Sequence, residues 1–180
     1  MRETGIVRRI DELGRVVIPK EIRKTLRIKE GDPLEIYTEK DELVFKKYSP
    51  IAEVNEMAKM TADAISEMTE CACVVTDTDS IIVVSGGKKD MIGKSISGEI
   101  DKVLQERKSV VIRKIDGGEI LPLYKGEEIS SENQILVPIL SNGDCYGVVA
   151  LFDKEKAKKP LSEEIIIVQL GAKFLSKQFE

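Results

Sequence analysis

Short alternating runs of apolar and polar residues open the chain and predict a small unit of ββαββ order. A turn at Gly14 separates the first two runs, and Pro19 stands where a helix would begin. A unit of this size without a disulfide or metal buries too little apolar surface to be stable alone, so we expect an obligate dimer. The expected elements cover residues 6–10, 16–18, 20–28, 34–38 and 43–48.

Longer apolar patterns follow and predict a second, mixed unit. Ser49-Pro50 is a helix-capping signal, after which apolar residues recur at spacings of three and four for about 20 residues. Asn142-Gly143 predicts a hairpin. We therefore expect an α+β protein with domains at residues 1–49 and 50–180. The second domain should contain strands at 71–76, 81–85, 110–112, 134–140 and 145–152, helices at 100–107 and 162–179, and a long loop at 116–133.

The charge is distributed unevenly along the chain. The whole sequence has a net charge of −4, yet residues 1–29 carry nine lysines and arginines against four acids. A basic head on an acidic body is typical of proteins that bind nucleic acids through one domain. The uneven distribution of charge therefore predicts that any DNA contact is made by the first domain.

The cations of the head follow a helical spacing. Residues 20, 23, 24 and 27 stand at i, i+3, i+4 and i+7 and would share one face of the expected helix. Further arginines stand on the preceding strand and at its hairpin, where they can flank that face. A solvated charged face is the plain alternative, but it does not explain why cations converge from three elements. The candidate DNA-binding residues are Arg8, Arg9, Arg15, Lys20, Arg23, Lys24 and Arg27.

Composition excludes several kinds of chemistry. The chain has no histidine, which removes Ser-His-Asp and Cys-His nucleophile systems and mixed Cys/His zinc sites. Three cysteines, at positions 71, 73 and 145, are expected to be small core residues with free thiols. Neither a signal peptide nor an apolar run long enough to span a bilayer is present, so we expect a cytoplasmic protein. No cofactor or metal is expected.

The segment from Thr4 to Leu26, TGIVRRIDELGRVVIPKEIRKTL, resembles the N-terminal domain of the AbrB family of bacterial transition-state regulators, and residues 31–37 and 46–48 continue the match. The resemblance implies a swapped-hairpin dimer in which two ββαββ chains interleave into one barrel and bind double-stranded DNA. It also implies Arg8, Arg15 and Arg23 as principal contacts. Lys24 stands where the family commonly has arginine, which keeps the charge but not the bidentate fork.

The second domain resembles a GAF domain, on the pattern of residues 74–79, 92–96, 137–139 and 146–151. This resemblance implies a sensing domain that could hold a small ligand between its sheet and the loops at 86–98 and 117–133. A domain retained for oligomerisation, with no ligand, is an equal alternative. With its long extension, the chain is similar to AbrB-family members that regulate forespore genes, as activators and repressors, in endospore-forming bacteria.

Two other functions stay open. The same head serves in antitoxins, although their tails are short and disordered whereas this one has two capped amphipathic helices. A GAF-type redox enzyme would use the cysteines, but buried thiols react slowly. Two association surfaces per chain, the head and the apolar stripes of residues 50–69 and 162–179, predict a tetramer.

Overall fold

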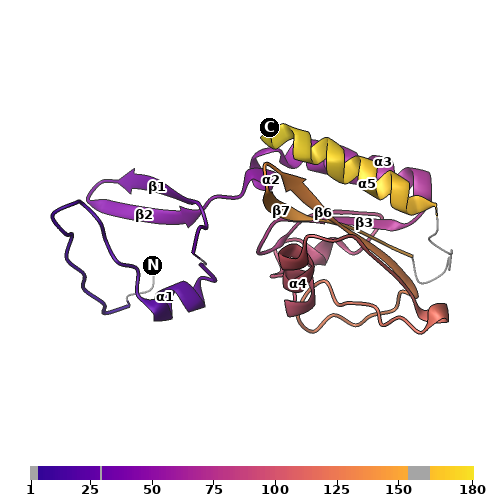
Figure 1. The fold of residues 1–180 in the computed structure, drawn as a ribbon, viewed down its shortest axis with the longest axis horizontal. Coiled ribbons are helices and arrows are strands. Elements are labelled where there is room, and N and C mark those ends of the chain that lie inside the picture. The colour runs from indigo at the N-terminus through magenta and orange to yellow at the C-terminus, as the bar shows by residue number, and fades with distance from the viewer. Residues whose placement is uncertain (1–3, 29, 154–162) are drawn as a thin grey trace. The chain divides into compact units, whose positions relative to one another are not determined.

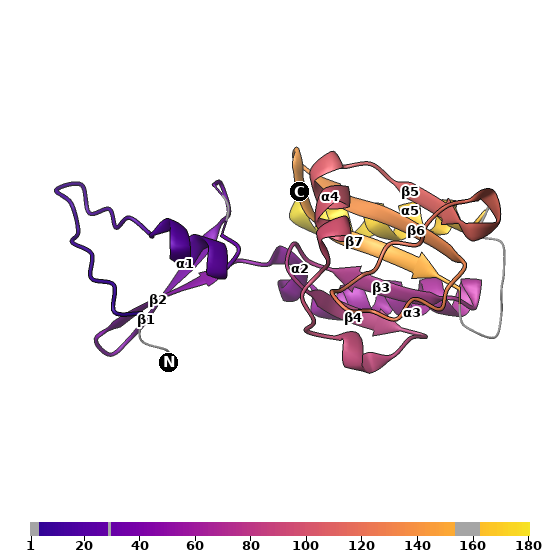
Figure 2. The same ribbon diagram turned by 90° about the horizontal axis from the view of Figure 1, so that it is seen from below.

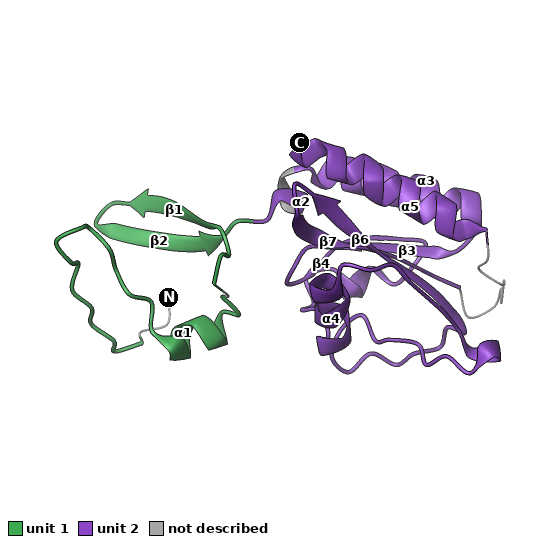
Figure 3. Cartoon of the chain, in the orientation of Figure 1, with its two compact units in different colours: residues 1–48 green, residues 49–180 purple. Residues whose placement is uncertain are grey.

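The computed structural model describes residues 4–28, 30–153 and 163–180. The chain divides into two compact units, Met1–Tyr48 and Ser49–Glu180 (Figure 3). Within the described residues, no helix is both long and apolar enough to cross a membrane.

The smaller unit consists of one short helix and one hairpin. The helix is α1, Lys20–Thr25, and the strands are β1, Leu34–Glu39, and β2, Glu42–Lys47, which pair antiparallel (Figure 1). Residues 4–18 form no strand, so the two strands predicted at 6–10 and 16–18 are absent from the single chain. A strand needs a neighbouring strand for its backbone hydrogen bonds, and in the single chain residues 4–18 pair with neither β1 nor β2.

The larger unit is built on a five-stranded antiparallel sheet of order β4-β3-β7-β6-β5. Each strand predicted in this unit is present, with its ends moved by at most a few residues. The strands are β3, Ala72–Thr76; β4, Ile81–Ser85; β5, Val110–Arg113; β6, Asn133–Ser141; and β7, Asp144–Phe152.

Two long helices cover one face of this sheet. They are α3, Asn55–Thr69, and α5, Glu164–Ser176, which lie side by side (Figure 1). The helix predicted from Pro50 is broken at Val54, whose φ of −98° and ψ of 28° separate α3 from the short α2, Pro50–Glu53. The predicted start of the last helix, Ser162, lies outside the described residues.

The opposite face of the sheet is covered by α4, Gly98–Glu106, and by the loop that leads from β5 to β6 (Figure 2). Side chains alternate between the two layers, as expected of a sheet covered on both faces. On β3, Cys73 and Val75 belong to the core beneath α3 and α5, while Val74 belongs to the core beneath α4. The strands therefore position the long loop against one end of the sheet.

Candidate nucleic-acid interface

The chain turns sharply between Asp11 and Arg15, and the carboxylate of Asp11 organises this turn. One carboxylate oxygen, Oδ1, accepts the backbone N–H groups of Leu13 at 3.0 Å and of Arg15 at 2.8 Å. The other, Oδ2, lies 2.7 Å from Nε of Arg15. Gly14 adopts a φ of +76°, which a residue with a Cβ rarely does. The arginine is therefore presented at the tip of the turn by its own loop.

The hydrogen bonds of this turn keep Asp11 ionised. The backbone N–H of Arg15 and then its guanidinium lower the pKa of the carboxyl from its ordinary value of 3.8. Asp11 thus neutralises part of the charge at the tip of the turn, where it lies against Arg15.

Helix α1 is short and has no buried residue. It presents Lys20 in its first turn and Arg23 and Lys24 in its last, all exposed to solvent. Cations in the last turn interact favourably with the helix dipole. The prediction that these three cations share a helix therefore agrees with the structure.

The seventh predicted residue, Arg27, does not continue this helical face. The helix ends at Thr25, and Arg27 takes a left-handed φ of 53°. The N–H of Ile28 then donates to the carbonyl of Arg23 at 2.8 Å, and the N–H of Arg27 donates to Lys24. This is the Schellman ending of a helix, a position at which glycine is usual. The prediction that Arg27 shares the face of the other cations was wrong, because the helix ends at Thr25, before it reaches Arg27.

Arg8 and Arg9 stand on the extended segment that precedes the turn, and both are exposed. The guanidinium of Arg8 donates to the neighbouring carbonyl of Val7, at 3.3 Å. All seven predicted cations are thus on the surface of the smaller unit. Three come together on α1, and the others lie on the chain before and after it.

Sequence reasoning missed the residue that joins the basic helix to the hairpin. The ammonium group of Lys47, on β2, donates to the backbone carbonyl of Arg27 at 3.1 Å and lies 3.2 Å from the carboxylate of Asp32. It therefore fixes the end of α1 and the turn after it to the strand. The sequence signal for it was a pair of lysines at the end of β2, and such a pair ordinarily predicts side chains that face solvent.

The comparisons with known proteins cover both units. Residues 53–180 match the family described as "Stage V sporulation protein T C-terminal, transcription factor", and residues 7–53 match "Antidote-toxin recognition MazE, bacterial antitoxin". The chain is 43% identical to stage V sporulation protein T of Bacillus subtilis (strain 168), over 100% of this chain and 99% of that protein. The chain belongs to the stage V sporulation protein T family of transcription factors.

Other relatives match parts of the chain. Transition state regulatory protein AbrB of Bacillus subtilis is 39% identical over 60% of this chain and 98% of its own length. The GAF domain of a phosphoenolpyruvate-protein phosphotransferase from Acinetobacter has a TM-score of 0.56 at 16% identity, covering 74% of this chain and 83% of that one. The predicted resemblances to AbrB and to a GAF fold are confirmed, the latter for the fold alone.

Proposed function

We propose that this protein regulates sporulation genes by binding double-stranded DNA through its basic head, with Arg8, Arg15, Arg23 and Lys24 as principal contacts. Arg9, Lys20 and Arg27 add supporting charge. The observation that carries the proposal is the exposure of all seven cations within residues 8–27 of a chain from a transcription-factor family. Arginine suits phosphates and guanine edges because its planar fork makes two parallel hydrogen bonds.

A second copy of the chain completes the head in this proposal. Apolar side chains of the head are largely exposed in the single chain, which is costly for a protein in water. The segment before α1 is free to pair with the same segment of another copy, as in a swapped-hairpin barrel. A two-fold dimer then displays every cation twice. The exposed apolar residues of the head include Val7, Ile10, Leu13, Val17, Ile36, Leu43 and Phe45.

The larger unit joins such dimers into a tetramer. Its helices α3 and α5 carry exposed apolar residues on the side away from the sheet, among them Met60, Met68, Ile166, Leu170 and Phe174. Apolar surface of this kind is stabilised by association with a second copy. If the heads pair one set of chains and these helices pair another, the closed assembly has four chains.

Binding should depend on DNA shape as well as on base contacts. Exposed arginines and lysines bind phosphates and respond to groove width as well as to base edges. We expect selected sites to be flexible sequences, at promoters active in the forespore, with activation at some and repression at others.

The test uses the full-length protein and DNA fragments that it selects from the genome of its host. Fluorescence anisotropy at physiological salt compares the parent with Arg15→Ala, Arg23→Ala and a matched control, Lys102→Ala, which removes an exposed cation from α4. The two arginine variants should bind roughly tenfold or more weakly, and the control should bind like the parent. Parental affinity in either arginine variant would contradict the assignment of contacts.

The two other functions are less well supported. The antitoxin family matches only the head, and residues beyond it form a packed sheet rather than a short tail. For a redox enzyme a reactive thiolate is required, but burial raises the pKa of Cys73 to about 12 and also raises that of Cys145. Co-purification with a small toxin would favour the first, and fast alkylation of a cysteine the second. We infer that the protein is not an enzyme.

A further inference from the structure

A cavity of about 390 Å³ lies in the larger unit, at the end of the sheet where the long loop packs. This volume is within the range of pockets that bind small molecules. Two loops form its sides: residues 86–91 after β4 and residues 120–131 before β6. Its apolar lining consists of Ala72, Met91, Ile120, Leu121, Leu123, Ile129 and Phe152.

Two polar side chains of the wall are occupied in holding the loop in place. The amide of Gln134 accepts from the N–H of Leu121 at 3.0 Å and donates to the carbonyl of the same residue at 2.9 Å. The carboxylate of Asp153 accepts the N–H groups of Glu132 and Asn133, both at 2.9 Å. Because these bonds fix the loop to β6 and to the end of β7, the cavity is pre-formed.

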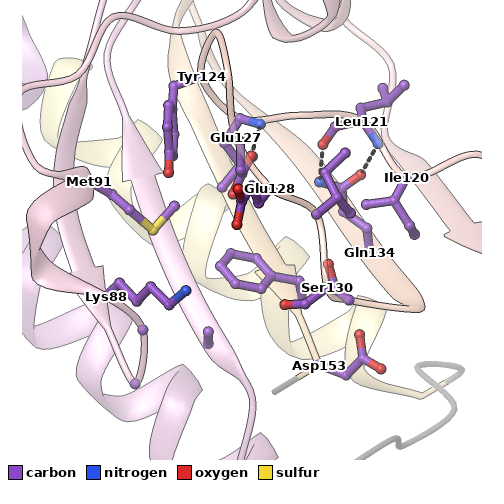
Figure 4. A pocket seen from close by; sticks show the side chains of 17 residues that line it. Lys88, Met91, Ile120, Leu121, Tyr124, Glu127, Glu128, Ser130, Gln134 and Asp153 are labelled. Atoms are coloured by element: carbon purple, nitrogen blue, oxygen red, sulfur yellow. Dashed lines mark hydrogen bonds between the residues drawn. The ribbon is translucent and has the colours of Figure 1, made fainter. Parts of the chain in front are cut away.

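Two other carboxylates of the wall can accept further hydrogen bonds. Oε2 of Glu127 accepts the backbone N–H of Leu123, while Glu128 makes no hydrogen bond or ion pair within the part of the chain that the structure describes. Figure 4 shows both side chains across the cavity from Met91 and Lys88. Burial raises the pKa of Glu127, and the backbone N–H groups of Leu123 and Tyr124 and then the positive charges of Lys94 and Lys88 oppose this rise. A half-buried carboxylate in this position is stabilised by a further cation.

We propose that this cavity binds a small apolar molecule that carries one ammonium group, with the ammonium at Glu127 and Glu128 and the apolar body against Met91, Leu123 and Phe152. Three carboxylates and one lysine line the walls, so an anion is disfavoured. The ring of Phe152 adds aromatic surface that attracts a cation, whereas the ring of Tyr124 already holds the ammonium of Lys94, 4.2 Å from its centroid. This site goes beyond DNA binding and does not depend on it.

The experiment follows methionine methyl groups in the full-length protein. The chain has five methionines, and Met91 lines the cavity whereas Met57, Met60 and Met68 stand on α3. Labelling every methionine methyl with ¹³C, and assigning Met91 with Met91→Leu, gives a local readout. The probes are 2-phenylethylamine, 2-phenylethanol and 3-phenylpropionate, which share an apolar body and differ in charge; isoamylamine adds a smaller amine.

An amine should shift the Met91 signal saturably and leave the α3 methionines unchanged. The alcohol should bind roughly tenfold more weakly, and the carboxylate should not shift Met91. If the alcohol saturated the Met91 shift at the same concentration as the amine, the proposal would be overturned, because an apolar cavity alone would explain equal affinities. Failure of both amines to shift Met91 at millimolar concentration would also overturn it.

Glutamine variants then test the two carboxylates. Glu127→Gln keeps an oxygen that can accept from Leu123 and removes only the charge, so amine affinity should fall roughly tenfold while alcohol affinity is unchanged. Glu128→Gln is a second variant should the first fail to fold, and Glu119→Gln, an exposed acid outside the cavity, is the control. Parental amine affinity in both cavity variants would contradict the role of the carboxylates.

Discussion

Asp11 holds Arg15 from within the same turn, with Oδ2 of the carboxylate 2.7 Å from Nε of the guanidinium. The same carboxylate accepts the backbone N–H of Arg15 through its other oxygen. An arginine at a loop tip would otherwise sample many rotamers and lose that freedom on binding a partner. Asp11 thus limits the positions of Arg15 before any partner arrives, in a part of the head where both residues are exposed.

This turn should depend on pH. The folded pKa of Asp11 is lowered, so its contribution to the turn is present above the unfolded value of 3.8 and is lost as the pH falls through the folded pKa. Titration of the Asp11 carboxyl carbon by NMR should give a midpoint below 3.8. Arg15→Gln should raise that midpoint only in part, because the backbone N–H remains. A midpoint at or above 3.8 in the parent would show that the turn is not formed in solution.

The left-handed residue at the end of α1 gives a second prediction. Glycine adopts this conformation without the steric cost that a Cβ brings, so Arg27→Gly should be more stable locally than Arg27→Ala by about 1 kcal/mol. Both variants lose the same side chain, which makes alanine the matched control. Hydrogen exchange of the Ile28 amide, which donates to Arg23, measures the difference. Equal protection in the two variants would contradict the left-handed helix end.

The head shows what the sequence can and cannot predict. The helix after Pro19 and the hairpin of β1 and β2 follow from local signals, namely a proline at the helix start and alternation in the strands. The position of Arg27 does not, because helical spacing carries no information on where the last turn ends. Lys47 was missed because its partners, Arg27 and Asp32, are distant in sequence.

In the larger unit the sheet was predictable, and the cavity lies between the sheet and the two loops that the GAF resemblance implied, but the hydrogen bonds that hold its walls were not predictable. Asn142-Gly143 marks the β6–β7 hairpin, and apolar runs mark every strand. The loop at 116–133 has no periodicity, so nothing in the sequence indicates that Gln134 and Asp153 anchor it. Hydrogen bonds of this kind depend on tertiary contacts, which a single sequence does not specify.

The outer surface of α3 and α5 should control assembly. Leu170 is 71% exposed on α5, and replacing it with glutamate places a charge where the tetramer would bury an apolar side chain. Leu170→Glu should therefore convert the proposed tetramer into a dimer, as measured by light scattering. Lys102→Glu, on α4, should leave the assembly unchanged. A parental mass for Leu170→Glu would show that this surface does not hold the tetramer together.

Glu127 should cost stability at neutral pH when no ligand is bound. Burial raises its folded pKa above the ordinary value of 4.5, so the parent loses stability as the pH rises from that value through the folded pKa. Glu127→Gln avoids this loss and should melt at a higher temperature than the parent at pH 7, with the difference vanishing below pH 4.5. Glu119→Gln should show no such trend. A destabilised Glu127→Gln at pH 7 would contradict the burial of a charged carboxyl.

The salt dependence of affinity tests most directly whether the exposed cations of a paired head bind DNA phosphates, as we propose. Each lost phosphate contact lowers the slope of log K against log salt by about 0.9, and a dimer loses two, so Arg23→Ala should lower it by about 1.8. Lys102→Ala should leave the slope unchanged. A parental slope and affinity for Arg23→Ala would contradict the claim.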